Sequence, residues 1–285
     1  IGLLKTTNPE LSKVLIRKWM ISAVEAVFSE RGFAAQGVLV IHGEQGTHKT
    51  TFIQSLVDPL LNAVKTGQLL DPSNKDSVLE SSNYWIVELG ELDATFRKAD
   101  IARLKAHITK DQDELRRAYA RKSSHMARRT VFVATVNESR FFVDETGNRR
   151  WWVISLTEAI NTRHGLNMQA IWREVYDLWQ AGENSELDKE TLAKLNEQNE
   201  DYLFIDPFEE KILSRFNQDK PNAQWMTTSD ILESIGYDKP SKADATRASA
   251  KIKKLGYNQG QGKLRRHFNM PAFNETLPPK QYPQE

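Results

Sequence analysis

The sequence contains no cysteine, which excludes disulfide bonds and thiolate metal sites. It has no apolar run of membrane-spanning length and no signal-peptide pattern, so we expect a cytoplasmic protein without a membrane partner. An excess of either charge is absent too, because the net charge is only +1. Any surface for nucleic acid must therefore arise from local clustering of basic residues. No methionine precedes Ile1, which suggests a segment of a longer polypeptide.

Short apolar runs alternate with helical patterns in the first 200 residues. This alternation is typical of an α/β fold with a mostly parallel sheet, whose strands are buried on both faces. We expect strands at residues 37–41, 84–88 and 130–136, and helices at residues 11–27 (ended by Gly32), 50–64, 98–109 and 171–195 (broken at Gly182).

The pattern changes near residue 200. From there we expect helices at residues 208–216, 228–235 and 243–255, a short strand at Trp225, and two strands around Gly260, Gln261 and Gly262. This order is typical of a winged helix, and the tail after Pro271 is expected to be irregular. We therefore divide the chain into a large domain of residues 1–200 and a small winged-helix-like domain of residues 201–285.

A glycine-bearing loop separates the first predicted strand from the next helix. Its residues are Gly43, Glu44, Gln45, Gly46, Thr47, His48, Lys49, Thr50 and Thr51. In such a P-loop the backbone N–H groups surround the β-phosphate of ATP, Lys49 reaches the β- and γ-phosphates, and the Thr50 hydroxyl ligates Mg²⁺. His48 replaces the usual glycine, and histidine tolerates left-handed backbone angles better than most residues. A chance glycine loop is the alternative, which the strand–loop–helix context disfavours.

Polar side chains follow the other two strands. Glu88 ends one of them, and Glu91 lies just beyond it. Because an ATPase needs a carboxylate near Mg²⁺ and a group that positions the attacking water, we assign Glu88 to magnesium and Glu91 to water activation. Asp93 is a weaker candidate for either role. Asn137 ends the third strand and is assigned to orienting the water, although an asparagine that begins a turn is a common alternative.

Two arginines, Arg149 and Arg150, precede the aromatic pair Trp151 and Trp152. Paired arginines can be ordinary surface charge. They can also supply an arginine finger, which stabilises the transferring phosphoryl group across a subunit boundary. In that case the active enzyme is an oligomer.

Several strings carry a family resemblance when they are taken together: residues 43–51, Val87-Glu88-Leu89-Gly90-Glu91-Leu92, Leu104-Lys105, Thr135-Val136-Asn137-Glu138 and Thr146-Gly147-Asn148-Arg149-Arg150. They resemble the virulence-associated E family, P-loop proteins of phages and mobile elements that are related to superfamily 3 replicative helicases. The similarity spans roughly residues 19–195.

The resemblance implies an AAA+ type core, a hexameric ring, and ATP-driven movement along single-stranded DNA in a bacterial or phage-infected cell. It also implies a primase or primase-polymerase region upstream in the same chain. The implied roles are phosphate binding for Lys49, magnesium binding for Thr50 and Glu88, a sensor for Asn137, and a finger for one of the two arginines.

Two basic stretches are candidates for contacts with DNA. In superfamily 3 relatives the segment before the sensor strand forms a hairpin in the ring channel, and by that analogy Arg121, Lys122 and His125 contact the single strand. The alternative is a solvated basic turn. The second stretch lies in the predicted winged helix, which binds duplex DNA or packs against protein. Its candidate contacts are Lys251, Lys254, Lys263 and Arg265.

We interpret the chain as an ATP-dependent DNA helicase or translocase domain of a phage or mobile-element replication protein. Two alternatives stay open on the sequence. One is a DNA-binding module that binds nucleotide but hydrolyses little of it, and the other is a P-loop switch that acts on a protein partner.

Overall fold

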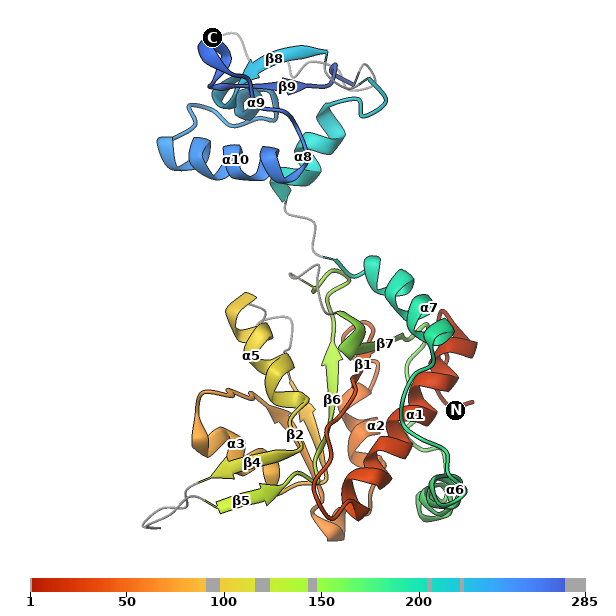
Figure 1. The fold of residues 1–285 in the computed structure, drawn as a ribbon. Helices are drawn as coiled ribbons and strands as arrows, with labels where there is room; N and C mark the ends of the chain where they lie inside the picture. The colour runs from red at the N-terminus through yellow and green to blue at the C-terminus, as the bar shows by residue number, and fades with distance from the viewer. Residues whose placement is uncertain are drawn as a thin grey trace. The chain divides into compact units, whose positions relative to one another are not determined.

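The computed structural model describes residues 2–90, 98–115, 124–142, 148–203, 207–220 and 223–274. Contacts within the chain divide it into two units, Ile1–Phe204 and Ile205–Glu285 (Figure 1). No helix among the described residues is long and apolar enough to cross a membrane.

A five-stranded parallel sheet forms the centre of the first unit, as the alternation of apolar runs predicted. In spatial order its strands are β2 (Val64–Gln68), β3 (Ile86–Leu89), β6 (Val131–Val136), β1 (Val38–His42) and β7 (Trp151–Ser155). Every residue of β3 and of β7 is buried. Strands of this kind need cover on both faces of the sheet.

Helices supply this cover on both faces (Figure 1). Phe132 of β6 contacts His107 of α5 (Lys98–Ile108) on one face. The next residue, Val133, points the other way and lines an apolar cavity with side chains of α1 (Pro9–Phe28), α2 (Lys49–Ser55) and α6 (Met168–Gln180). This opposition follows from the two-residue period of a strand.

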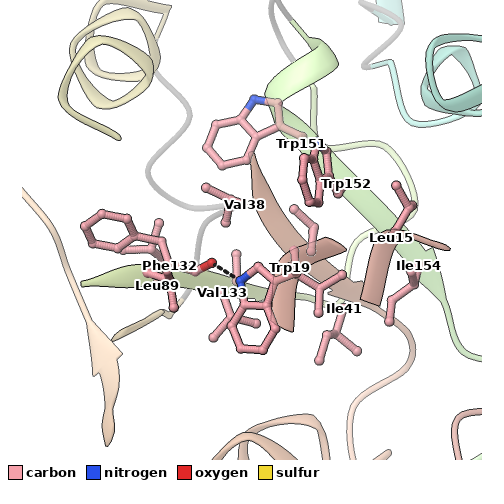
Figure 2. Packing of buried hydrophobic residues seen from close by; sticks show 14 of the residues in the cluster. Leu15, Trp19, Val38, Ile41, Leu89, Phe132, Val133, Trp151, Trp152 and Ile154 are labelled. Atoms are coloured by element: carbon pink, nitrogen blue, oxygen red, sulfur yellow. Dashed lines mark hydrogen bonds between the residues drawn. The ribbon is translucent and has the colours of Figure 1, made fainter. Parts of the chain in front are cut away.

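Three tryptophans belong to the core (Figure 2). Trp19, Trp151 and Trp152 are each no more than 2% exposed. The indole N–H of Trp19 donates to the backbone oxygen of Phe132 at 2.8 Å, which ties α1 to β6. Gly37 allows Trp152 its place, since a Cβ there would lie 2.2 Å from the indole nitrogen. The three indoles are therefore structural rather than stacking platforms for bases.

Strand β7 lies at an edge of the sheet, and two side chains and one backbone amide donate to its outward carbonyl groups. In α7 (Lys189–Glu200), Asn199 Nδ2 donates to the Trp151 oxygen at 3.0 Å and Gln198 Nε2 donates to the Val153 oxygen at 2.9 Å. The amide of Thr7 donates to the Ser155 oxygen at 3.0 Å. An edge paired in this way offers little to another strand.

The ends of two predicted helices differ in the structure. α1 spans Pro9–Phe28, close to the predicted residues 11–27, and it ends before Gly32 because Ser29 turns the chain into an extended conformation. The helix predicted for residues 50–64 ends at Ser55, because Pro59 lacks an amide hydrogen and begins the 3-10 turn η1 (Pro59–Leu61). The residues that follow form strand β2, which the helical pattern concealed.

The remaining elements of the first unit are short. α3 (Lys75–Ser82) precedes β3, and β4 (Gln112–Leu115) pairs antiparallel with β5 (Ser124–Ala127).

The helical segment predicted for residues 171–195 is interrupted at Gly182, as expected, and becomes α6 and α7. Gly182 has a φ of 94°, a left-handed conformation that suits glycine.

The second unit has its own hydrophobic core, which includes Phe208, Ile231 and Phe268. Its elements are α8 (Pro207–Arg215), β8 (Gln224–Thr227), α9 (Thr228–Ser234), α10 (Lys242–Lys254), η3 (Gly262–Leu264) and β9 (His267–Met270). The two strands predicted around Gly260 are corrected: β9 pairs with β8, while the residues before Gly260 contribute an isolated bridge from Gln259 to Phe268. The 3-10 turn η3 begins at Gly262, so the chain after the glycines becomes a strand only at His267.

Candidate functional site

The loop of residues 43–48 joins the carboxyl end of β1 to the first residue of α2. Gly43 continues the sheet by donating its amide to the Val136 oxygen at 3.2 Å. Gly46 has a φ of 86°, and His48 has a φ of 61° and a ψ of 28°, so both are left-handed. His48, which stands where glycine is usual, thus has the left-handed conformation that histidine tolerates better than most residues.

Lys49 directs its ammonium group into the centre of this loop. Its side chain is buried, and Nζ donates to the backbone oxygens of Gly43 and Glu44 at 2.6 and 2.8 Å. It also donates to Asn137 Oδ1 at 2.9 Å, and Thr47 Oγ1 lies 3.2 Å away. The ammonium therefore lies at the centre of the loop, beside Asn137.

Glu88 is 1% exposed and faces Thr50. Its Oε1 accepts hydrogen bonds from the Thr50 hydroxyl at 2.7 Å and the Thr135 hydroxyl at 2.8 Å, and Oε2 accepts from the Gly67 amide at 3.3 Å. A carboxylate beside a hydroxyl is the hard oxygen set that Mg²⁺ binds together with phosphate oxygens and water. Thr50 and Glu88 thus fit this ion.

These groups line one cavity of about 460 Å³ at the carboxyl edge of the sheet. Gln45, Thr51 and the other loop residues from 46 to 50 form one side of it, and Glu88 and Asn137 face them. Thr66, Gly67, Gly90 and Thr135 also line it and were missed by the sequence reasoning. Thr135 was detectable, because it lies two residues before Asn137 and so points to the same face of its strand. Of the loop residues, Glu44 contributes a backbone oxygen that Lys49 contacts.

Arg149 and Arg150 lie in the 3-10 turn η2 (Asn148–Arg150), at the amino ends of the parallel strands, whereas the loop lies at their carboxyl ends. β7 is parallel to β1, and Trp151 is paired with Val38 while Ser155 is paired with His42. The arginines thus precede the amino end of β7, whereas the loop follows the carboxyl end of β1. Four strand steps of about 3.3 Å, roughly 13 Å in all, separate the two ends. The fold does not bring these arginines to the loop of their own chain.

The structure describes only some of the remaining predicted site residues. The predicted water-activating residue Glu91 and the predicted DNA contacts Arg121 and Lys122 lie outside the described residues. His125 is exposed on β5, in the antiparallel pair that would carry the predicted hairpin. Lys251 Nζ lies 2.8 Å from Glu209 Oε1, so its charge is partly neutralised within the second unit, which weakens its assignment to DNA. Three predicted contacts are exposed: Lys254, Lys263 and Arg265.

Arg128 shows why a basic stretch in sequence does not make a basic surface. Its guanidinium is buried and donates to the backbone oxygens of His107 and Ile108. Its neighbour Arg129 donates to the Val27 oxygen at 2.8 Å. Arg128 thus links the residues before β6 to α5, and Arg129 links them to α1. The basic stretch before β6 therefore has fewer positive side chains available to contact DNA than its sequence implied.

His42 precedes the loop and is enclosed by polar and aromatic groups. Its Nδ1 lies 2.8 Å from the Ser155 hydroxyl, which contacts the Tyr202 hydroxyl in turn. Burial, followed by the positive charge of Lys49, lowers the pKa of His42. Burial also raises the pKa of Tyr202. Both groups are therefore neutral near pH 7.

The lowered pKa of His42 predicts a pH effect on stability. The folded state takes up a proton at His42 less readily than the unfolded chain, whose histidine pKa is about 6.5. The contribution of neutral His42 to the free energy of unfolding is thus fully present above the unfolded-state pKa. It is lost as the pH falls through the lower pKa of His42 in the folded state. We expect His42→Asn, which keeps a polar atom for Ser155, to flatten the fall in unfolding free energy between about pH 7 and 5. Urea titrations at each pH would measure it, with the exposed His125→Asn as a control; equal slopes in His42→Asn and the parent would contradict the prediction.

The left-handed His48 predicts a second pair of variants. Left-handed angles cost a non-glycine residue roughly 1–2 kcal/mol, whereas glycine loses about 0.4–1 kcal/mol more in unfolded-state entropy. His48→Gly should therefore change the free energy of unfolding by less than about 1 kcal/mol, and His48→Val should lower it by about 1–3 kcal/mol because β-branched residues resist this conformation. Urea denaturation measures both. A glycine variant as destabilised as the valine variant would show that the histidine side chain itself holds the loop.

Comparison with curated proteins gives no match. Among solved structures, the apo A form of the NrS-1 C-terminal region (residues 305–718) has 15% identity and a TM-score of 0.48 over 95% of this chain and 77% of that chain. Another apo structure of the same region has 17% identity and a TM-score of 0.44 over 95% and 77% of the two chains. A family model, the virulence-associated protein E-like domain, matches residues 1–204, which are the residues of the first unit. The chain therefore belongs to the virulence-associated protein E-like family.

Proposed function

We propose that the first unit is a P-loop ATPase domain of AAA+ type that drives movement along single-stranded DNA, as a helicase or translocase. The observation that carries the proposal is the convergence of Lys49, Thr50, Glu88 and Asn137 on one cavity at the loop. These residues come from α2, β3 and the end of β6, and a purely structural role would not require them to meet.

Each of these residues has a chemical task. The loop amides and Lys49 bind the phosphates of ATP, and Thr50 and Glu88 hold Mg²⁺, which neutralises phosphate charge when it is bound. Asn137, whose amide oxygen accepts a hydrogen bond from Lys49, is proposed to orient a water molecule beside the γ-phosphate. Glu91, three residues after Glu88, is our candidate for accepting the proton of that water.

The arginines are proposed to act between copies of the chain. Because Arg149 and Arg150 lie at the edge of the sheet opposite to the loop, they would reach the phosphates of a neighbouring copy. A head-to-tail arrangement of this kind closes into a ring when the rotation between copies allows it. We propose a hexamer, as the resemblance to superfamily 3 helicases implies.

DNA is proposed to bind at two places. The β4–β5 pair is the base of the proposed hairpin, with Arg121, Lys122 and His125 toward single-stranded DNA. The second unit is proposed to be a winged helix that contacts duplex DNA through the exposed Lys254, Lys263 and Arg265. Such a domain suits a cytoplasmic replication protein of a phage or mobile element, with a primase or primase-polymerase region in the same chain.

Steady-state ATP hydrolysis at several protein concentrations, with and without single-stranded DNA, tests the proposal. Turnover per copy is expected to rise with concentration, because the arginines act in trans, and to rise again with DNA. Nucleotide binding without turnover under all these conditions would instead favour a binding module. Turnover indifferent to every nucleic acid would favour a switch that acts on a protein partner.

A further inference from the structure

A single buried side chain donates hydrogen bonds to both ends of η2, the turn that contains Arg149 and Arg150 and is called the arginine turn below. Asn199, in the last turn of α7, is 1% exposed. Its Nδ2 donates to the backbone oxygen of Asn148 at 3.1 Å and to that of Trp151 at 3.0 Å. Asn148 is the first residue of η2, and Trp151 is the residue after its last. One amide group therefore donates hydrogen bonds to the backbone on both sides of Arg149 and Arg150.

The arginine side chains do little to hold the turn themselves. Among the described residues, neither guanidinium has a hydrogen bond or ion pair, and Arg149 is exposed. Both arginines line a cavity of about 610 Å³ together with Asn196, Asn199 and Glu200. The position of the guanidinium groups thus depends on how their backbone is held, which is the part that Asn199 contacts.

We propose that Asn199 is a positioning residue for the arginines that act on the neighbouring copy's nucleotide, an inference that rests on the proposed function. A guanidinium that stabilises a transferring phosphoryl group must be held within about 0.5 Å of its productive place. An amide with two N–H donors matches the two backbone oxygens, whereas aspartate or leucine at position 199 would donate to neither. Asn199 itself touches neither nucleotide nor water in this role.

Asn199→Leu tests the proposal, because it keeps the branched shape and the number of heavy atoms of the side chain and removes both donors. We expect kcat to fall about 10- to 100-fold, the usual cost of misplacing a reacting group by about 1 Å. The KM for ATP and the binding of a fluorescent ATP analogue should not change, since the loop lies at the other edge of the sheet. Gln198→Leu is the matched control: it removes a donor to the same edge strand, at Val153, without contacting the turn.

Mixtures of two inactive variants separate positioning from a general structural role. Copies with Lys49→Ala retain their arginines, and copies with both Arg149→Ala and Arg150→Ala retain their loop. Together they should recover turnover. Adding Asn199→Leu to the Lys49→Ala copy should lower this recovered turnover about 10- to 100-fold. Adding it to the double arginine variant should have no effect, because that copy has no arginine to position.

The outcomes discriminate between the two proposals. Two outcomes would overturn the positioning role and leave the proposed function standing. In the first, Asn199→Leu in the Lys49→Ala copy does not change the recovered turnover. In the second, Asn199→Leu lowers the recovered turnover equally in either copy. A parent protein without turnover, or a mixture that recovers none, overturns the proposed function and this inference with it. If circular dichroism shows that Asn199→Leu does not fold, Asn199→Ala takes its place in the same mixtures.

Discussion

Replacing Lys49 with alanine is expected to lower ATP turnover at least about 100-fold, the usual cost of removing one charged donor from a developing negative charge. The ammonium is buried at the centre of the loop and donates to Gly43, Glu44 and Asn137. Under the proposed function, phosphates bound at the loop would lose their cation without this ammonium, and the Asn137 amide oxygen would lose the hydrogen bond that it accepts from Nζ. Steady-state hydrolysis and binding of a fluorescent nucleotide would both be measured.

Lys65→Ala is the matched control for this prediction. Lys65 lies on β2 and pairs with Glu80 at 2.7 Å, so the variant removes a lysine of the same unit without altering the loop. We expect it to hydrolyse ATP at the parental rate. Lys49→Ala with parental turnover, in a protein whose circular dichroism and melting temperature match the parent, would contradict the assignment of the loop to phosphate.

Glu88→Gln is expected to lower turnover about 100-fold and to weaken its dependence on Mg²⁺. The amide keeps the shape of the carboxylate but carries no charge to attract the ion. Thr50 and Thr135 can still donate to the remaining oxygen, because each now donates to Oε1. The new NH₂ group would face the Gly67 amide, so we expect a loss of about 1 kcal/mol in unfolding free energy.

A titration of turnover against Mg²⁺ measures this effect, and urea denaturation measures the stability change. Glu80→Gln serves as the control, because Glu80 is a carboxylate of the same unit whose partners are Lys65 and Gln68. A Glu88→Gln protein with the magnesium dependence of the parent would remove Glu88 from the metal site. A large loss of stability with parental turnover would make its role structural.

The loop itself could be recognised in the sequence because its geometry is local. A buried strand, a short glycine-bearing turn and a helix follow one another without interruption between Val38 and Ser55. The backbone angles that each residue tolerates then decide the shape, including the left-handed angles at Gly46 and His48. Glu88 was assignable for a related reason: it lies near the carboxyl end of an apolar strand, and parallel strands end at a common edge.

Other parts of the cavity were hidden by ambiguous local patterns. Residues 50–64 suit a helix by periodicity, yet Pro59 ends it and the chain returns as β2, which brings Thr66 and Gly67 to the site. Periodicity does not separate a short buried strand from a helical segment when apolar residues are dense. The missed strand therefore removed one wall of the site from the prediction.

By itself the sequence determined the family, the glycine-bearing loop between β1 and α2, and the polar residues at the ends of β3 and β6, because these depend on adjacent residues and on strand periodicity. Only the tertiary structure decided that Arg128 and Lys251 turn to partners within the protein, and that Asn199 brackets the arginine turn. It also decided that Arg149 and Arg150 lie across the sheet from their own loop. Such relations join residues far apart in the chain, and they depend on strand order and direction, which no local pattern of side chains specifies.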